Sequence, residues 1–260
     1  MTMRKSTIKK VFVIARNTFT ETVRDKILYG IFAFALITII GVLLIGSLSL
    51  GDDVYIVRSL GLAGIYVFSL IITVFIGASL VYKELEKKTI YLLLSKPVSH
   101  GNVVLGKYFG LFASVIVITS LMLLVYLGVV LFSGGGFDYH AILAVFLQYF
   151  ELGLLIALLI LFSIFSTPLA ATIYTIIVLY IGHLLSLFSY YASHTGGIYK
   201  VFLIVVYYIF PNLEKFNIRN MVVHDMIPSG WEILYIVLYG SIYIVLALYL
   251  SVILLKRREL

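Results

Sequence analysis

Long apolar stretches separated by short polar segments dominate the chain. Five of them carry no Asp, Glu, Lys or Arg residue: 27–51, 59–82, 108–137, 152–199 and 233–255. About 20 residues of α-helix cross the ~30 Å hydrocarbon core of a bilayer. Four stretches therefore have the length of one span each, and the stretch 152–199 is long enough for two. The pattern predicts an all-α integral membrane protein.

The longest stretch is divided by the sequence FSTPLA, residues 165–170. Pro168 lacks the amide hydrogen that a helix interior uses, and it restricts Thr167 to extended backbone. A break there predicts six transmembrane helices in all. They cover approximately residues 27–50, 60–82, 108–132, 141–166, 169–190 and 232–255. Because six is even, both termini are expected on the same side of the membrane.

Two further segments have a helical pattern but do not fit a span. Within residues 8–25 the apolar side chains repeat at three- and four-residue spacing: Ile8, Val11, Phe12, Ala15, Phe19 and Val23. This spacing predicts an elbow helix in the membrane interface, or a plain linker helix. In the segment 191–231 the apolar run 201–210 is too short to cross. We expect an outer insert there, with a re-entrant or surface-lying helix that Pro211 stops.

Composition and charge agree with this interpretation and give an orientation. Hydrophobic residues make up 62% of the chain and charged residues only 12%, whereas a soluble domain has roughly a quarter of its residues charged. Fifteen of the nineteen Lys and Arg residues lie near the termini or in the segment 83–107. The positive-inside rule places these three regions in the cytoplasm, below an inner (cytoplasmic) membrane. The net charge of +7 therefore indicates membrane topology and not a nucleic-acid partner.

Catalytic chemistry has no support in the motifs. The chain lacks cysteine, which excludes a disulfide framework and a thiolate nucleophile. The patterns H-E-x-x-H and G-x-S-x-G are also absent from the sequence, and they are typical of metalloproteases and serine hydrolases. We expect no catalytic residue, no enzymatic activity in this chain and no cofactor.

The segment GNVVLGKY, residues 101–108, comes one residue short of a phosphate-binding loop. Such a loop follows a strand and ends in Ser or Thr, which holds Mg²⁺. Here Tyr108 stands at that position, the inner residues are bulky, and a transmembrane span follows. We interpret Lys107 as an anchor at the inner interface, and we expect no nucleotide site at this segment.

An apolar patch, TIYLLL at residues 89–94, precedes that segment in the cytoplasmic loop. Lys87, Lys88 and Lys96 bracket it. An exposed apolar cluster with a charged rim is typical of a docking surface. The alternative is that the patch packs against helices of this same chain.

The loop KELEKKTIYLLLSKPVSHGNVVLGKYFG resembles the coupling region of type-2 ATP-binding-cassette (ABC) permeases, which docks onto a separate ATPase. The corresponding residues are Glu84, Glu86, Thr89, Ile90, Leu93, Leu94, Ser95, Pro97, Val98, Ser99, His100, Leu105, Gly106 and Lys107. His100 replaces the arginine that is usual in that family, and Lys88 stands where glycine is frequent. Neither departure removes the coupling surface.

The resemblance extends over essentially the whole chain. ARNTFTETVRDKILYGIF is similar to the elbow helix and first span of these permeases, and FELGLLIALLILFSIFSTPLA is similar to their fourth span. The likeness is greatest to the copper-enzyme-maturation branch, which serves nitrous oxide reductase assembly. It implies a permease, an exporter, that works by alternating access with a cytoplasmic ABC ATPase. It also implies a second permease copy, as a homodimer or a paired homologue, in a lipid bilayer.

Two other functions remain open at this stage. An ion-gradient-driven secondary transporter would show internal repeats, broken spans and several buried acids, and the sequence shows no clear repeat and one candidate acid. A non-transporting membrane anchor or assembly factor for enzyme maturation would use the ATPase for a mechanical task. The sequence is compatible with both.

Glu151 is the one acidic residue in the interior of a predicted span. It lies about 15 Å from the outer end of the fourth span, at 1.5 Å per helical residue, and His183 lies at a similar depth in the fifth. A buried ionisable residue is a functional candidate. We expect Glu151 and His183 either to line a pathway as a hydrogen-bonded pair, or to make structural hydrogen bonds.

The outer insert contains four residues that could bind a soft metal ion: His194, Met221, His224 and Met226. Imidazole and thioether ligands suit Cu(I). Their spacing matches no established site, and we expect no metal here.

Overall fold

The computed structural model describes residues 2–24, 53–86 and 99–258, together with six residues between 33 and 41. Within these ranges all regular secondary structure is helical. The long helices are α1 (Thr2–Arg24), α3 (Asp53–Glu86), α5 (His100–Phe132), α6 (Tyr139–Phe165), α7 (Pro168–His194) and α10 (Gly230–Arg258). The segment between α7 and α10 contains α8 (Gly197–Ile209), the 3₁₀ helix η1 (Leu213–Phe216) and α9 (Arg219–Val223).

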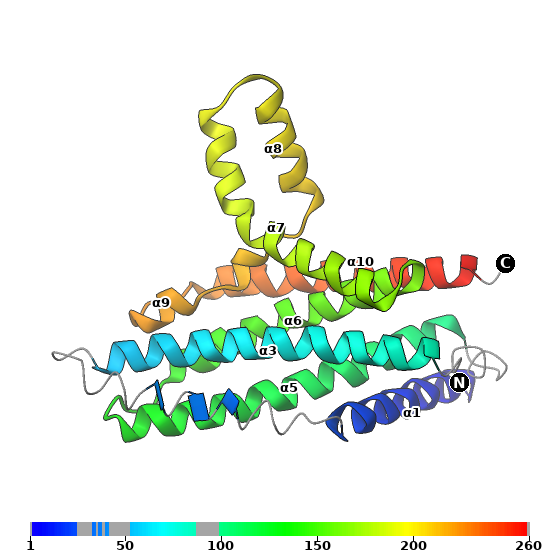
Figure 1. The fold of residues 1–260 in the computed structure, drawn as a ribbon, viewed down its shortest axis with the longest axis horizontal. Helices are drawn as coiled ribbons and strands as arrows, with labels where there is room; N and C mark the ends of the chain where they lie inside the picture. Colours follow the sequence, from blue (N-terminus) through cyan, green and yellow to red (C-terminus); the bar gives the residue numbers. More distant parts are fainter. Residues whose placement is uncertain are drawn as a thin grey trace.

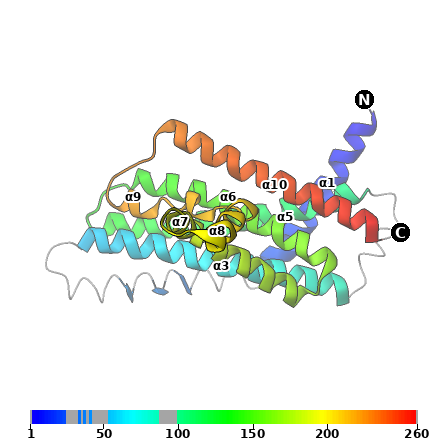
Figure 2. The same cartoon turned by 90° about the horizontal axis from the view of Figure 1, so that it is seen from above.

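Four helices, α3, α5, α6 and α10, run side by side along the longest axis of the molecule (Figure 1). Helix α6 is central, since it contacts α3, α5, α7 and α10 as well as η1 and α9. Figures 1 and 2 show α1 and the last residues of α10 at the same end of the bundle, where α3 ends and α5 begins. The described ends of the chain therefore lie at one end of the bundle, and their common side of the membrane stays a prediction.

Five of the described helices are long and apolar enough to cross a membrane: α3, α5, α6, α7 and α10. The number becomes six if α8 and residues 213–223, which meet at a bend of 52°, count as one broken span or re-entrant loop. The predicted first span, 27–50, lies largely outside the described residues. One of its described members, Phe34, is fully buried and packs edge-on against Phe68 of α3 at a ring separation of 5.7 Å.

The helix boundaries follow from side-chain caps. Ser99, Asp138 and Thr167 are the N-caps of α5, α6 and α7, and the side chain of each accepts a backbone amide hydrogen bond. Pro168 occupies the first turn of α7, where its missing amide hydrogen costs nothing. The predicted break between the fourth and fifth spans therefore stands where Pro168 indicated it.

Helix α5 begins eight residues before the predicted third span, because Ser99 caps it at His100. The segment 101–107 is consequently two turns of helix within the motif that resembled a phosphate-binding loop. From Val103 onwards the amide groups donate to the i−4 carbonyls, so this segment does not form the open loop that wraps around a phosphate.

Helix α1 packs directly on the first turns of α5. Gly106 lies against Ile14, and Gly110 lies against Ala15 and Thr18. The two glycines are four residues apart, a spacing that lets helix backbones approach closely within membranes. The buried face of α1 carries Thr18 and Thr22, whereas Ile8 and Phe12 of the predicted interfacial face are exposed.

Helix α7 covers the predicted fifth span and continues to His194. Its last part leaves the bundle, and α8 returns beside it as a hairpin that points away from the other helices (Figure 1). Helix α8 ends at Ile209, two residues before Pro211, and none of its residues is buried. After the hairpin the chain re-enters the bundle, and η1 and α9 pack against α6.

Candidate functional site

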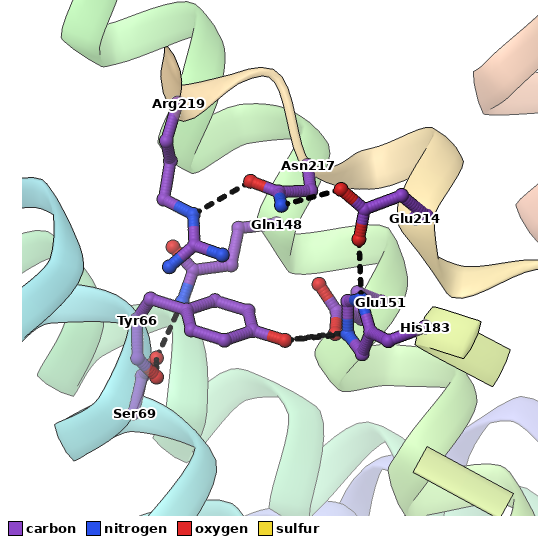
Figure 3. Close-up of polar contacts among 8 residues, drawn as sticks. All are labelled: Tyr66, Ser69, Gln148, Glu151, His183, Glu214, Asn217 and Arg219. Atoms are coloured by element: carbon purple, nitrogen blue, oxygen red, sulfur yellow. Dashed lines mark hydrogen bonds and ion pairs between the residues drawn. The ribbon is translucent and has the colours of Figure 1, made fainter. Parts of the chain in front are cut away.

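A cluster of polar side chains lies where the outer insert meets the spans (Figure 3). Eight residues form it: Tyr66 and Ser69 of α3, Gln148 and Glu151 of α6, His183 of α7, Glu214 of η1, Asn217, and Arg219 of α9. They come from segments that are far apart in the sequence.

Glu151 is at the centre of the cluster, and its side chain is only 1% exposed. It is buried because α6 is the central helix and the neighbouring Leu152 is also fully buried. A carboxylate in such a place must have hydrogen-bond partners. Tyr66 donates its hydroxyl hydrogen to Glu151 Oε1 at 2.8 Å. His183 Nε2 lies 2.9 Å from the same carboxylate oxygen and 2.6 Å from the Tyr66 hydroxyl.

His183 connects two carboxylates. Its Nε2 faces Glu151, and its Nδ1 lies 2.7 Å from Glu214 Oε2. When both carboxylates are ionised, both ring nitrogens must donate, and only the protonated imidazole can do so. The pair of Glu151 and His183 considered from the sequence is therefore present as a direct contact, with Glu214 as a third member.

The outer insert supplies the other charged members of the cluster. Asn217 donates to Glu214 Oε1 at 2.8 Å, and Arg219 Nε donates to Asn217 Oδ1 at 2.8 Å. The guanidinium carbon of Arg219 lies 3.5 Å from the centre of the Tyr66 ring, a cation–π contact. The cluster thus combines two carboxylates with one guanidinium and one imidazole.

Close packing around Gly182 and Gly240 positions Glu214. The carbonyl of Pro211 and the side chain of Leu213 lie against Gly182 of α7, and Phe216 lies against Gly240 of α10. A side chain at either glycine would overlap with residues of the insert.

The backbone of the insert is also held by hydrogen bonds and buried side chains. The amide of Asn212 donates to the hydroxyl of Tyr239 at 2.7 Å. Leu213 and Phe216 are buried on either side of Glu214. These contacts hold η1 in the position in which Glu214 faces His183.

A second polar contact extends the cluster between α3 and α6. Gln148 donates through Nε2 to the hydroxyl of Ser69, and Ser69 donates to the carbonyl of Tyr66. Both side chains are buried. Gln148 lies three residues before Glu151, so both project from nearly the same face of α6.

Sequence reasoning identified Glu151 and His183 but missed Tyr66, Glu214, Asn217 and Arg219. Glu214 and Arg219 were visible as charges in an otherwise apolar outer segment. Their place in the cluster depends on the return of the insert into the bundle, which no local pattern indicates.

A separate polar cluster lies at the end of the bundle where α3 begins. Arg58 of α3 approaches Asp138 at 3.5 Å and Asp225 at 3.0 Å, and it donates to the carbonyl of Gly135 at 3.2 Å. Asp138 also accepts from Tyr126 at 2.7 Å. These contacts join α3, the α5–α6 connection and the end of the insert.

The four residues considered as soft metal ligands do not form one site. His224 stacks on Tyr55 near the outer end of α3, whereas His194 contacts Ser193 and the carbonyl of Tyr190 at the end of α7. Figure 1 shows the end of α7 and the end of α9 in different parts of the molecule. Among the described residues, no three His, Cys, Asp or Glu side chains are grouped to hold a metal ion.

The residues of the predicted coupling region are only partly described. Glu84 and Glu86 belong to the last turns of α3, and Ser99 and His100 stand at the start of α5. These helix ends lie beside α1 and the C-terminal end of α10 (Figure 1). The remaining residues lie outside the described part of the chain: Thr89, Ile90, Leu93, Leu94, Ser95, Pro97 and Val98.

Comparison with known protein families gives a match over residues 19–186 to the ABC-2 family transporter protein. The matched region covers more than half of the chain and extends from α1 into α7. The chain belongs to the ABC-2 transporter family. Among curated proteins, none matches it. As an ABC-2 family member it is an integral membrane protein and a transport subunit, of a kind that generally works with a cytoplasmic ATPase.

Tyr66, Glu151 and His183 lie inside the region that matches the ABC-2 family, whereas Glu214 and Arg219 lie after it. The cluster therefore joins the part of the chain shared with the family to the insert that follows. The resemblance of the coupling-region residues to type-2 ABC permeases agrees with this family. The copper-enzyme-maturation branch is a proposal.

Proposed function

We propose that this chain is the permease subunit of an ABC exporter, powered by a separate ATPase subunit that docks on the cytoplasmic loop 83–107. The observation that carries the proposal is the family match over residues 19–186, which includes the helices on both sides of that loop. The helical backbone of residues 101–107 agrees with it, because this segment does not form a phosphate-binding loop of its own.

Helix α5 is suited to transmit force from the docked ATPase. It begins one residue after Ser99 and continues for 33 residues, about 50 Å at 1.5 Å per residue. Gly106 and Gly110 fix α1 against its first turns. Movement of the coupling region would therefore tilt α1 and α5 together and carry the motion to the outer end of the bundle.

Two permease copies would form the pathway, as a homodimer or a pair with a related permease. A single bundle of five or six spans is small for a complete ATP-driven route. Both termini would face the cytoplasm across the cell membrane, which the excess of Lys and Arg at that end supports. The resemblance further supports the copper-enzyme-maturation branch as the subfamily.

We assign Glu151 and His183 to the transport pathway. Their burial within α6 and α7, in contact at 2.9 Å, supports this role because buried ionisable residues in spans are costly. Replacement of Glu151 by Gln preserves shape and hydrogen bonding but removes the charge. Altered substrate-stimulated ATPase activity in a folded E151Q complex is the expected result, and an unchanged activity would contradict the role.

Co-purification from native membranes in mild detergent, with mass spectrometry of the bound proteins, tests the proposed function. We expect an ABC ATPase to be recovered in similar amount. The double variant Leu93→Asp and Leu94→Asp should release it, while the control Leu93→Met and Leu94→Met should retain it. Recovery of the chain alone, with transport intact, would contradict the proposal.

An ion-gradient-driven transporter is the second candidate, because the buried cluster at Glu151 is of the kind that binds coupling ions. The two mechanisms separate in proteoliposomes that contain the purified chain without any ATPase. Uptake driven by an imposed ion gradient, and lost in E151Q, would favour the second candidate. A membrane anchor or assembly factor would show neither ATP-driven nor gradient-driven movement of a solute.

A further inference from the structure

The imidazole of His183 bridges two carboxylates of very different exposure. Glu214 on the insert has a side chain that is 40% exposed, His183 is 22% exposed and Glu151 is 1% exposed. The distances are 2.7 Å from Nδ1 to Glu214 and 2.9 Å from Nε2 to Glu151. The three groups form a continuous line of hydrogen bonds from the surface of the insert to the centre of the bundle.

This geometry allows a proton to move without movement of the backbone. A proton on Glu214 passes to Nδ1 of His183, while the proton on Nε2 passes to Glu151. The imidazole ends in its other neutral tautomer, and rotation of the ring returns it to the starting arrangement with Glu151 still protonated. One proton is removed from the exposed carboxyl and one is added to the buried carboxylate, so charge and atoms balance.

We propose that Glu214, His183 and Glu151 form a proton relay that loads Glu151 with a proton taken up at the surface of the outer insert. The bound species is a proton, and the buried carboxyl of Glu151 is its acceptor.

Every charged or titratable neighbour of the relay has a defined place. The hydroxyl of Tyr66 of α3 donates to Glu151 Oε1, and its oxygen also lies 2.6 Å from Nε2 of His183, so it contacts both the donor and the acceptor of the inner transfer. Arg219 of α9 lies over the Tyr66 ring, and Asn217 donates to Glu214.

The relay is independent of the source of energy for transport. An ABC exporter and an ion-driven transporter could both use a protonatable Glu151, and either function could stand if the relay failed. The experiment therefore measures proton binding by the chain itself and does not measure transport or ATP hydrolysis.

Infrared difference spectroscopy of the purified full-length chain in lipid nanodiscs is the test. Acidification from about pH 9 to about pH 5, a range that includes the usual titration of His, should produce the carbonyl stretch of a protonated carboxyl in an apolar environment. The band should be absent in E151Q. The wild-type spectrum alone is informative: if no such band forms, Glu151 does not change its protonation over this pH range and the relay is wrong.

The rate at which the band appears after a pH jump tests the path. The variant Glu214→Gln should slow it about a hundredfold, the lower range for loss of one acid–base group, with the final amplitude retained. Glu232→Gln is the matched control, since Glu232 contacts Ser229 and no member of the relay. Loading of E214Q at the wild-type rate would overturn the proposal. Elution of each variant as a single size-exclusion peak checks the fold.

Discussion

Gly110 of α5 lies so close to α1 that a Cβ atom there would stand 2.6 Å from the carbonyl oxygen of Ala15. The same atom would lie 2.6 Å from Cβ of Thr18. One turn earlier, a Cβ atom on Gly106 would lie 2.6 Å from Cβ of Ile14. The two glycines therefore determine how closely the N-terminal helix docks on the helix that begins at the coupling region.

The variant Gly110→Ala should loosen the contact between α1 and α5. The obstructing atom belongs to the backbone of α1, so the helices must separate, at a cost of about 1–3 kcal/mol. A lower midpoint of thermal unfolding in detergent would show it. Gly128→Ala is the control in the same helix, because no atom lies within 4 Å of its added Cβ, and it should leave the midpoint unchanged or raise it slightly.

The ion-pair network of Arg58, Asp138 and Asp225 predicts very different losses of stability for substitutions at two of its members. Arg58→Gln should destabilise the fold by about 3 kcal/mol, because Asp138, whose side chain is 1% exposed, would keep a buried charge without its cation. Asp225→Asn should cost less than about 1 kcal/mol, because Asp225 is 54% exposed. Thermal unfolding of both variants compares the two costs, and equal effects would contradict the assigned burial.

The variant Gly182→Ala should displace the insert from α7. Its Cβ atom would lie 2.8 Å from the carbonyl oxygen of Pro211, and a backbone atom cannot move aside as a side chain does. We expect faster cleavage of residues 211–223 by added protease. In the Gly182→Ala background, Glu214→Gln should no longer slow the appearance of the infrared band. Gly196→Ala, at an open position in the same region, should be cleaved at the wild-type rate.

Two substitutions of Tyr66 separate the role of its hydroxyl from that of its ring. Tyr66→Phe removes the hydrogen bond to Glu151 but keeps the ring beneath Arg219, and it should cost about 1–3 kcal/mol. Tyr66→Leu also removes the cation–π contact and should cost about 0.5–2 kcal/mol more. Thermal unfolding gives both values. A Phe variant as damaging as the Leu variant would mean that Arg219 does not depend on the ring.

The sequence predicted the positions of the spans better than it predicted which segments pack against each other. Pro168 and Thr167 marked the break between α6 and α7 because their effects are local to the backbone. The start of α5 was missed by eight residues, since hydropathy locates the membrane and Ser99 determines where the helix begins. The predicted interfacial face of α1 is exposed at Ile8 and Phe12, but its packing face includes Ile14 and two buried threonines.

In the candidate site, too, some residues could be identified from the sequence and others could not. Glu151 and His183 could be found from the sequence because an ionisable group in an apolar stretch is conspicuous, and equal depth suggested their contact. Glu214, Asn217 and Arg219 could not be assigned to it, because their position depends on packing at Gly182 and Gly240.

The sequence by itself determined that this chain is a helical membrane protein with a basic end and one acidic residue, Glu151, in the interior of a predicted span, because every residue of a span must be compatible with the apolar bilayer. Only the tertiary structure decided that the outer insert returns to that acid. Contacts such as Leu213 on Gly182 and Glu214 on His183 join residues about 30 positions apart. Shape complementarity between distant segments, which leaves no periodic pattern in the chain, holds them together.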